Sequence, residues 1–305
     1  MKTRRKFIQT VGIGSAIALT GSFPEIASAA QEKTLVILHT NDTHSHLEPF
    51  PDNHKQYPGL GGVAARKKLI DDIKSEGHPT LVLDAGDIFQ GTPYFNFFLG
   101  EPELKSMSQM GYDATTLGNH DFDGGLDNIH KQLFHCNFPF INSNYDFTNT
   151  LLSGKIKTHE VFVKKGIRIG VFGLGIELNG LVPNDLYKGV VYNDPLVAAN
   201  ETADFLKNKK KCDIVIALSH LGYKYKSNKI CDIHIAEKSR YIDLIIGGHT
   251  HTFMDQPDVR RNLDNEEVSI HQVGWAGVKL GRINVKFLGK RKKMSSSTLT
   301  VIVDK

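Results

Sequence analysis

The sequence predicts a multi-layered α/β domain in which short strands are buried beneath helices. Short apolar runs recur along the chain without the strict alternation of a half-exposed strand, and stretches with helical periodicity lie between them. Such unalternated runs are typical of strands that are covered on both faces. The chain has 305 residues, of which 40% are hydrophobic. That content is sufficient for a sizeable core and excludes wholesale disorder.

The expected elements alternate along the chain. Strands are predicted at 35–38, 81–83, 169–174, 214–218 and 242–246, and helices at 62–74, 126–134, 195–207 and 230–238. Pro195 directly follows Asp194, an arrangement that suits the first turn of the third helix. Strands are also predicted at 268–273, 278–287 and 297–303, with the basic segment 289–293 as a charged turn. No linker or repeat interrupts this pattern, so residues 31–305 are predicted to form one domain.

Charge and cysteine content exclude several classes of protein. The formal net charge is +4, and most of it comes from basic residues near the start of the chain. The remainder is almost neutral, which excludes the electrostatic footprint of a protein that binds a nucleic-acid duplex. The three cysteines have no CxxC spacing, so a disulfide scaffold and a zinc ribbon are excluded. A disulfide between Cys212 and Cys231 stays open, because a sequence does not give Cα distances.

The amino terminus predicts an export signal. Arg4-Arg5 lies in a segment that resembles the twin-arginine motif, and an apolar stretch and the small-residue sequence Ala27-Ser28-Ala29 follow it. The apolar stretch is about half as long as a membrane-spanning helix must be. Residues 1–30 are therefore expected to be a twin-arginine signal peptide. The protein is expected to reach the periplasm, without stable membrane insertion after the signal is removed.

Polar motifs follow five of the apolar runs at their carboxyl ends. They are Asn41-Asp42-Thr43-His44, Gly86-Asp87, Gly118-Asn119-His120-Asp121, Ser219-His220 and Gly247-Gly248-His249-Thr250-His251. The carboxyl edge of an open α/β sheet is where ligands bind. We therefore expect the five motifs to meet at one edge and to form the functional site.

The residue types in these motifs are metal ligands. Asp, His and Asn occur together without cysteine, and borderline divalent ions such as Zn, Mn, Fe or Co accept imidazole and carboxylate together. The candidate ligands are Asp42, His44, Asp87, Asn119, His220, His249 and His251. Seven ligands are too many for one tetrahedral ion, and they suit two divalent ions that share a carboxylate.

The ordered motifs resemble those of the calcineurin-like metallophosphoesterases, specifically the 5′-nucleotidase branch. That family's pattern is D-x-H, G-D, G-N-H-[DE], H and G-H-x-H, and all five occur in this order between residues 42 and 251. Each motif alone is weak, whereas the ordered set is very specific. The resemblance implies a four-layer α/β/β/α sandwich, with two sheets between helices, and hydrolysis of phosphate esters.

The resemblance also implies a role for each site residue. One ion is expected to be held by Asp42, His44 and His251, the other by Asn119, His220 and His249, with Asp87 as the bridge. Two ions in such a site generate a bridging hydroxide that attacks phosphorus. His120 is expected to lie over the phosphoryl group as an electrophile or proton donor, and Asp123 to orient it.

The expected substrates are phosphate monoesters, above all nucleoside monophosphates. The same motifs allow a phosphodiesterase acting on 2′,3′-cyclic nucleotides or a hydrolase of sulfur esters. The alternative from another class is a catalytically idle metal-binding subunit of a larger complex. The larger 5′-nucleotidases add a second domain that binds the base, and the metal motifs here are followed by no match to it. We therefore expect either a separate substrate-binding polypeptide or a less selective enzyme.

Residues beside the motifs are expected to play no direct part. His39 is predicted to pack in the interior, and Asp84 to support the site without binding metal. His46 is a weak candidate ligand. Aromatic residues near the motifs, such as Phe95, Phe97, Phe98 and Trp275, are more often core residues than platforms for a nucleobase.

Overall fold

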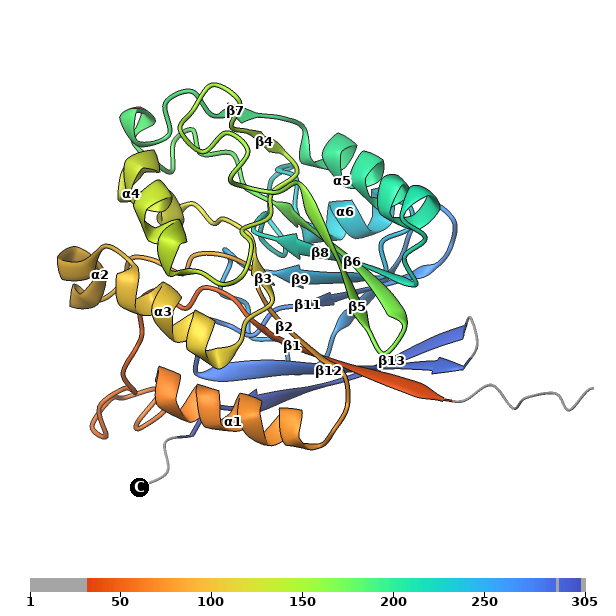
Figure 1. The fold of residues 1–305 in the computed structure, drawn as a ribbon, viewed down its shortest axis with the longest axis horizontal. Helices are drawn as coiled ribbons and strands as arrows, with labels where there is room; N and C mark the ends of the chain where they lie inside the picture. Colours follow the sequence, from red (N-terminus) through yellow and green to blue (C-terminus); the bar gives the residue numbers. More distant parts are fainter. Residues whose placement is uncertain (1–31, 289–290, 303–305) are drawn as a thin grey trace, which may run out of the picture. The chain divides into compact units, whose positions relative to one another are not determined.

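Two mixed β-sheets lie face to face in the protein (Figure 1). The computed structural model describes residues 32–288 and 291–302. The signal peptide predicted at 1–30 lies outside the described residues. The chain from Glu32 onward forms one compact unit.

The first sheet has five strands. These are β1 (Lys33–Thr40), β2 (Thr80–Asp84), β3 (Ala114–Thr115), β12 (Lys279–Leu288) and β13 (Arg291–Thr300). Their order is β13–β12–β1–β2–β3. Because β1, β2 and β3 run parallel, their carboxyl ends meet at one edge, whereas β12 and β13 are antiparallel to their neighbours.

The second sheet has six strands. These are β5 (His159–Lys164), β6 (Ile167–Leu174), β8 (Ile214–Ser219), β9 (Leu244–Gly247), β10 (Asp258–Arg261) and β11 (Glu267–His271). Their order is β10–β11–β9–β8–β6–β5, and the four central strands run parallel. A separate pair is formed by β4 (Tyr145–Asp146) and β7 (Val191–Tyr192).

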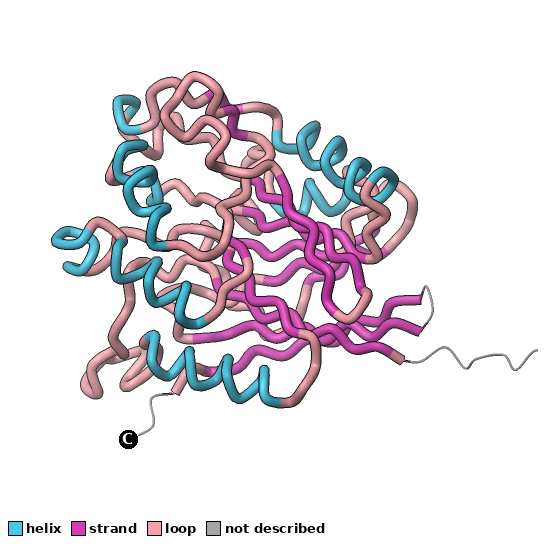
Figure 2. Tube along the Cα trace, in the orientation of Figure 1, coloured by secondary structure: helices cyan, strands magenta, loops and turns pink. Residues whose placement is uncertain are grey.

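Helices cover both outer faces of the sheets, so the protein has four layers. The helices are α1 (Val63–Ser75), α2 (Pro93–Phe98), α3 (Glu101–Met110), α4 (Gly125–Gln132), α5 (Pro195–Asp204) and α6 (Asp232–Lys238). Figures 1 and 2 show α1 and α3 on the side of the first sheet and α5 and α6 on the side of the second. The predicted α/β/β/α sandwich is confirmed.

Burial on both faces explains the unalternated apolar runs. Successive side chains of a strand point to opposite faces of its sheet. In β1, Leu35 and Ile37 enter the core between the sheets, while Val36 and Leu38 enter the core beneath α1 and α3. The second sheet is covered in the same way, with Val215 of β8 packed beneath α5 and α6. Neither face of these strands has room for a regular series of polar residues.

The predicted elements differ from the structure at several points, among them the strands β5 and β10, which the sequence pattern does not predict. Strand β13 begins at Arg291, not at 297, because Arg291 pairs with Leu288 of β12. Residues 291–293 of the expected charged turn are therefore strand residues, and the ammonium group of Lys292 forms an ion pair with Asp243. The sequence pattern also does not predict α2 and α3, because Gly and Pro residues interrupt the region around them. All three cysteines are free, so Cys212 and Cys231 form no disulfide.

Candidate metal centre

The five motifs meet where the parallel strands of both sheets end. β1 leads into Asp42 and His44, and β2 leads into Asp87. On the second sheet, β8 leads into His220, and β9 leads into the turn with His249 and His251. Asn119 and His120 follow the short strand β3. The edge predicted from the motif positions is thus the place where their side chains come together.

The convergent side chains form two adjacent clusters. In each cluster the possible ligand atoms lie within 4.8 Å of one another; the clusters are Asp42, His44 and His251, and Asp87, His220 and His249. Oδ2 of Asp87 lies 3.1 Å from Nε2 of His220 and 3.9 Å from Nε2 of His44, so one carboxylate oxygen faces both clusters. Asn119 joins the second cluster, where its Oδ1 accepts a hydrogen bond from Nδ1 of His249 at 2.8 Å.

His220 tests whether these residues suit a metal ion. Its Nδ1 donates to the carbonyl oxygen of Ala85 at 2.7 Å, which is the contact that commonly orients a metal-ligating histidine. Its Nε2 is buried and faces the carboxylates of Asp87, at 3.1 Å, and Asp42, at 3.9 Å. Burial disfavours the charged imidazole, but the carboxylate of Asp87 outweighs this effect and raises the pKa of His220. The carboxylates that face Nε2 therefore favour a positive charge at this position, which a divalent ion would bring.

His44 and His251 give the same result for the first cluster. Their Nε2 atoms lie 3.0 Å apart, and Nε2 of His251 lies 3.4 Å from Oδ1 of Asp42. Nδ1 of His44 faces the carbonyl oxygen of Phe89 at 3.3 Å. Two imidazole lone pairs repel each other at such a distance unless a proton or a metal ion lies between them. Both clusters therefore fit a divalent cation.

Backbone contacts hold the ligand loops against one another. The amide of Asp42 donates to the carbonyl oxygen of Gly86 at 2.9 Å, and the amide of His249 donates to both carboxylate oxygens of Asp42, at 2.9 and 3.0 Å. Glycines allow the close approach. A Cβ on Gly118 would lie 2.1 Å from Oδ1 of Asp87, and one on Gly248 would lie 3.0 Å from the carbonyl oxygen of Ala85.

Asp121 is a positioning residue that the sequence analysis assigned no role. Its buried carboxylate accepts hydrogen bonds from the amides of Asp87, Ile88, Phe89 and Gly118, at 2.8 to 3.1 Å. These bonds fix the loop that presents Asp87. Its position within the Gly118–Asp121 motif marks Asp121 as a residue near the site. The sequence alone does not show whether such a carboxylate binds a metal ion or backbone amides.

His120 and Asp123 form a hydrogen-bonded pair beside the two clusters. Nδ1 of His120 and Oδ2 of Asp123 are 2.8 Å apart, and the amide of His120 donates to Oδ1 of Asp87 at 2.7 Å. The His120 ring lies 5.3 Å from that of His44, measured between ring centroids. The hydrogen bond to Asp123 raises the pKa of His120, although burial acts in the opposite direction. The side chain of His120 is partly exposed, so it borders the open face of the site.

The other candidates near the motifs lie outside both clusters. Asp84 is buried behind the strands and accepts hydrogen bonds from Thr40 at 2.6 Å and Thr115 at 3.1 Å. His39 packs against His271 between the sheets. His46 turns Nδ1 back to the carbonyl oxygen of His44 at 2.8 Å.

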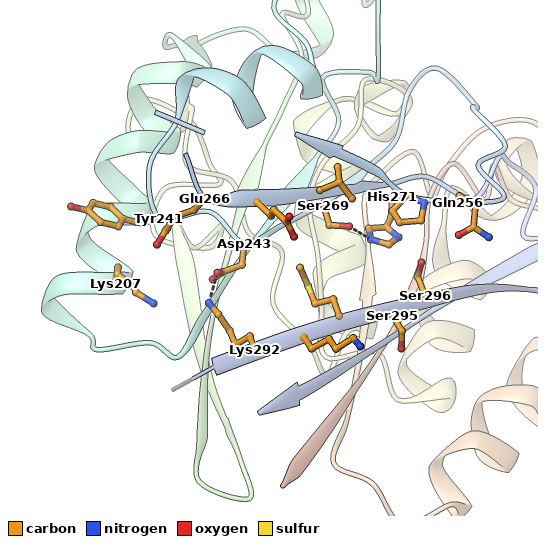
Figure 3. Close-up of a pocket in the computed structure, with 15 residues that line it drawn as sticks. Lys207, Tyr241, Asp243, Gln256, Glu266, Ser269, His271, Lys292, Ser295 and Ser296 are labelled. Atoms are coloured by element: carbon orange, nitrogen blue, oxygen red, sulfur yellow. Dashed lines mark hydrogen bonds and ion pairs between the residues drawn. The ribbon is translucent and has the colours of Figure 1, made fainter. Parts of the chain in front are cut away.

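A cavity of about 720 Å³ is lined by none of the candidate metal ligands (Figure 3). Asp243, which precedes β9, lines it, whereas His249 follows β9. Its polar groups include pairs that satisfy each other: Lys292 with Asp243, and the hydroxyl of Ser269 with Nε2 of His271 at 2.7 Å. The chemistry indicated by the motifs is therefore not located in this cavity.

The fold and the site together define a class of protein: an α/β sandwich whose strand ends carry a site suited to two divalent ions. A family profile described as calcineurin-like phosphoesterase matches residues 35–253. The chain belongs to the calcineurin-like phosphoesterase family.

Individual relatives support this assignment. The chain is 34% identical over 286 residues to the trifunctional nucleotide phosphoesterase protein YfkN of Bacillus subtilis, covering 83% of this chain and 18% of that protein. It is 34% identical over 292 residues to a 5′-nucleotidase of Vibrio cholerae, covering 87% of this chain and 51% of that protein. The structure of a 5′-nucleotidase precursor from Thermus thermophilus superposes with a TM-score of 0.80 at 30% identity, covering 88% of this chain and 54% of that one. The chain thus spans about half the length of these relatives, or less.

Proposed function

We propose that the protein is a metal-dependent hydrolase of phosphate monoesters and that nucleoside monophosphates are its substrates. The observation that carries this proposal is the meeting of two ligand clusters at Asp87, with the His120–Asp123 pair beside them. Relatives named 5′-nucleotidase support nucleotides as the substrate class.

Each cluster is proposed to hold one divalent ion of the Zn, Mn, Fe or Co type. The proposed ligands are Asp42, His44 and His251 for one ion and Asn119, His220 and His249 for the other, with Asp87 between them. Two ions held there would act as Lewis acids on the phosphoryl oxygens and lower the pKa of water.

His120 is proposed as the residue that moves a proton. Because Nδ1 is engaged with Asp123, Nε2 is the nitrogen available to donate to an oxygen of the substrate. Asp123 fixes the orientation of the ring and stabilises its cationic form. The amide of His120 donates a hydrogen bond to Asp87. This bond fixes the proposed proton donor beside the proposed bridging ligand. A metal-binding subunit without activity would not need this pair.

The test is a phosphate-release assay on protein loaded with Mn²⁺ or Zn²⁺. Substrates should include nucleoside monophosphates, an aryl phosphate, a sugar phosphate and 2′,3′-cyclic nucleotides. Steady release from the monoesters is expected. Release from cyclic nucleotides alone would favour a phosphodiesterase, an alternative that the relative named trifunctional nucleotide phosphoesterase keeps open. No release from any ester by metal-loaded protein would contradict the proposal.

We also propose that residues 31–305 form the metallophosphatase domain and that the protein is exported by the twin-arginine route to the periplasm. The sequence around Arg4 and Arg5 supports export. None of the helices in the described part of the chain is long and apolar enough to cross a membrane. Replacing both arginines by lysine should leave full-length, active precursor in the cytoplasm. Cell fractionation measures where the variant accumulates. Unchanged export of the variant would refute the twin-arginine route.

A further inference from the structure

An apolar groove lies beside the metal centre. Its volume is about 420 Å³, within the range of roughly 300–1,000 Å³ that is typical of small-molecule sites. One wall is the loop that follows His44, and the other is helix α2. The apolar lining residues include Pro49, Phe50, Pro93, Tyr94, Phe97 and Phe98. Glu48 is the one carboxylate among the residues that line the groove.

Side-chain contacts anchor both walls of the groove. Phe95, the buried ring of α2, stacks on Phe89 with 5.5 Å between ring centroids, which fixes the helix on the core. The hydroxyl of Tyr94 donates to Oε1 of Glu48 at 2.7 Å and so connects the two walls. This anchoring leaves Phe97 and Phe98 with 78% and 53% of their surface exposed. The two rings are neighbours, with 6.4 Å between centroids, and contiguous exposed apolar surface is the kind that marks interaction sites.

Ring contacts connect the groove to the metal centre. The indole of Trp275 stacks on the imidazole of His251, with 5.7 Å between centroids and an angle of 7°. Trp275 contacts His46 at 5.2 Å, and His46 contacts Phe50 of the groove at 5.0 Å. On the other wall, the hydroxyl of Thr92 donates to the carbonyl oxygen of Ser45, the residue after His44, at 2.9 Å. A series of ring contacts therefore connects a proposed metal ligand with the groove.

We propose that this groove binds the flat aromatic leaving group of the substrate, a nucleobase or an aryl ring, while the phosphoryl group occupies the metal centre. The proposal rests on the function proposed above and adds the part of the substrate that the chain itself recognises. Stacking on aromatic side chains accepts any flat ring, because every base has a π-face. With one carboxylate and no lysine or arginine among its lining, the groove favours a neutral ring over an additional phosphate group.

The first test compares two phosphate monoesters, adenosine 5′-monophosphate and glycerol 3-phosphate, in the metal-loaded mature chain. The double variant Phe97→Ala/Phe98→Ala removes two exposed rings that lie outside the buried core, so the fold should persist. A base that stacks on aromatic side chains loses affinity when those rings are replaced by alanine. We therefore expect kcat/KM to fall at least about tenfold more for the nucleotide than for the glycerol ester. Phe134→Ala is the matched control, because Phe134 is 80% exposed and does not line the groove.

The second test does not depend on catalysis. Trp275 is the single tryptophan of the chain and lies between the groove and the metal centre, so its fluorescence reports on ring binding. Adenosine, which has no phosphate, should quench this fluorescence saturably, and the double variant should require at least about tenfold more adenosine than the Phe134→Ala control. If the unmodified protein hydrolyses neither ester, the proposed function fails, and this titration still decides whether the groove binds a ring.

Two results would overturn the proposal. One is an equal change in kcat/KM for both esters in the double variant, including no change for either, which would assign the exposed rings to another partner. The other is adenosine quenching that is absent or that is identical in the double variant and the control.

Discussion

The number of ions that the metal centre binds can be determined from how the free energy of unfolding depends on the concentration of free metal. A ligand that binds only the folded state adds RT ln(1 + [L]/Kd) to the free energy of unfolding. Well above Kd, each tenfold rise in free metal therefore adds about 1.4 kcal/mol for every ion bound. The structure provides two clusters with ligand atoms within 4.8 Å, so we expect about 2.7 kcal/mol per tenfold rise for two ions.

The bridging position of Asp87 makes a sharper version of this prediction. Its Oδ2 faces His220 at 3.1 Å and His44 at 3.9 Å, so Asp87→Ala removes a carboxylate from both clusters. The slope for this variant should fall to about 1.4 kcal/mol per tenfold rise or below. The assay is denaturant unfolding of the mature chain at several buffered concentrations of free Mn²⁺ or Zn²⁺, followed by the fluorescence of Trp275.

A carboxylate outside both clusters provides the control. Asp255 is 90% exposed at its side chain and pairs with Lys279 at 3.3 Å. Asp255→Ala should leave the slope at the value of the unmodified protein. A slope of about 1.4 kcal/mol per tenfold rise in the unmodified protein would mean one ion, and no dependence on metal would mean none; either result refutes the two-ion site.

Three further changes test individual residues. His120→Asn should retain both ions by elemental analysis but lose about 10²–10⁴-fold in kcat; loss of an ion would reassign His120 as a ligand. Burial, followed by the nearby His271, lowers the pKa of His39 from 6.5 to about 3. The unfolded chain therefore takes up a proton below pH 6.5 that folded His39 does not, so this part of the stability is present above pH 6.5 and is lost as the pH falls towards 3. The stability difference between the unmodified protein and His39→Gln should shift by about 2 kcal/mol between roughly pH 7 and pH 5, and a difference independent of pH would contradict a buried neutral ring. Gly281→Ala should destabilise by about 1–3 kcal/mol in denaturant melts, because its Cβ would lie 1.9 Å from Nε2 of His39; a neutral result would mean that the two strands separate without cost.

The parts of the fold that sequence predicts are those in which burial is uniform. β1, β6 and β8 are covered on both faces, so their apolar runs are visible without knowledge of their neighbours. Helix α3 escapes prediction even though Leu104, Met107 and Met110 are buried at helical spacing, because Gly100 and Pro102 at its start indicate a turn. The start of β13 depends on pairing with β12, which is a long-range property that the local sequence does not contain.

In the candidate site, too, the sequence predicts some features, whereas others depend on long-range contacts. That the seven ligand candidates converge follows from the rule that polar residues at the ends of parallel strands share an edge. What each neighbouring residue does is decided by contacts with distant segments. Phe95, Phe97 and Phe98 lie in one short helix, yet Phe95 is buried and the other two are exposed. The expectation that such aromatics belong to the core is therefore correct for Phe95 and wrong for Phe97 and Phe98.

The backbone of the ligand loops is the feature that sequence conceals most completely. Five of the seven candidate ligands have φ between 47° and 69°: Asp42, His44, Asp87, His249 and His251. This left-handed conformation typically costs a non-glycine residue about 1–2 kcal/mol, and less for aspartate, whose short side chain can hydrogen-bond locally. A fold retains such residues only where surrounding contacts determine the conformation, and the bonds from backbone amides to Asp42 and Asp121 supply those contacts here. A glycine at these positions would remove the strain but also the ligand. The strained loops are therefore the consequence of directing five side chains from the ends of three strands into two adjacent clusters. Divalent cations account for why these charged and polar side chains converge there.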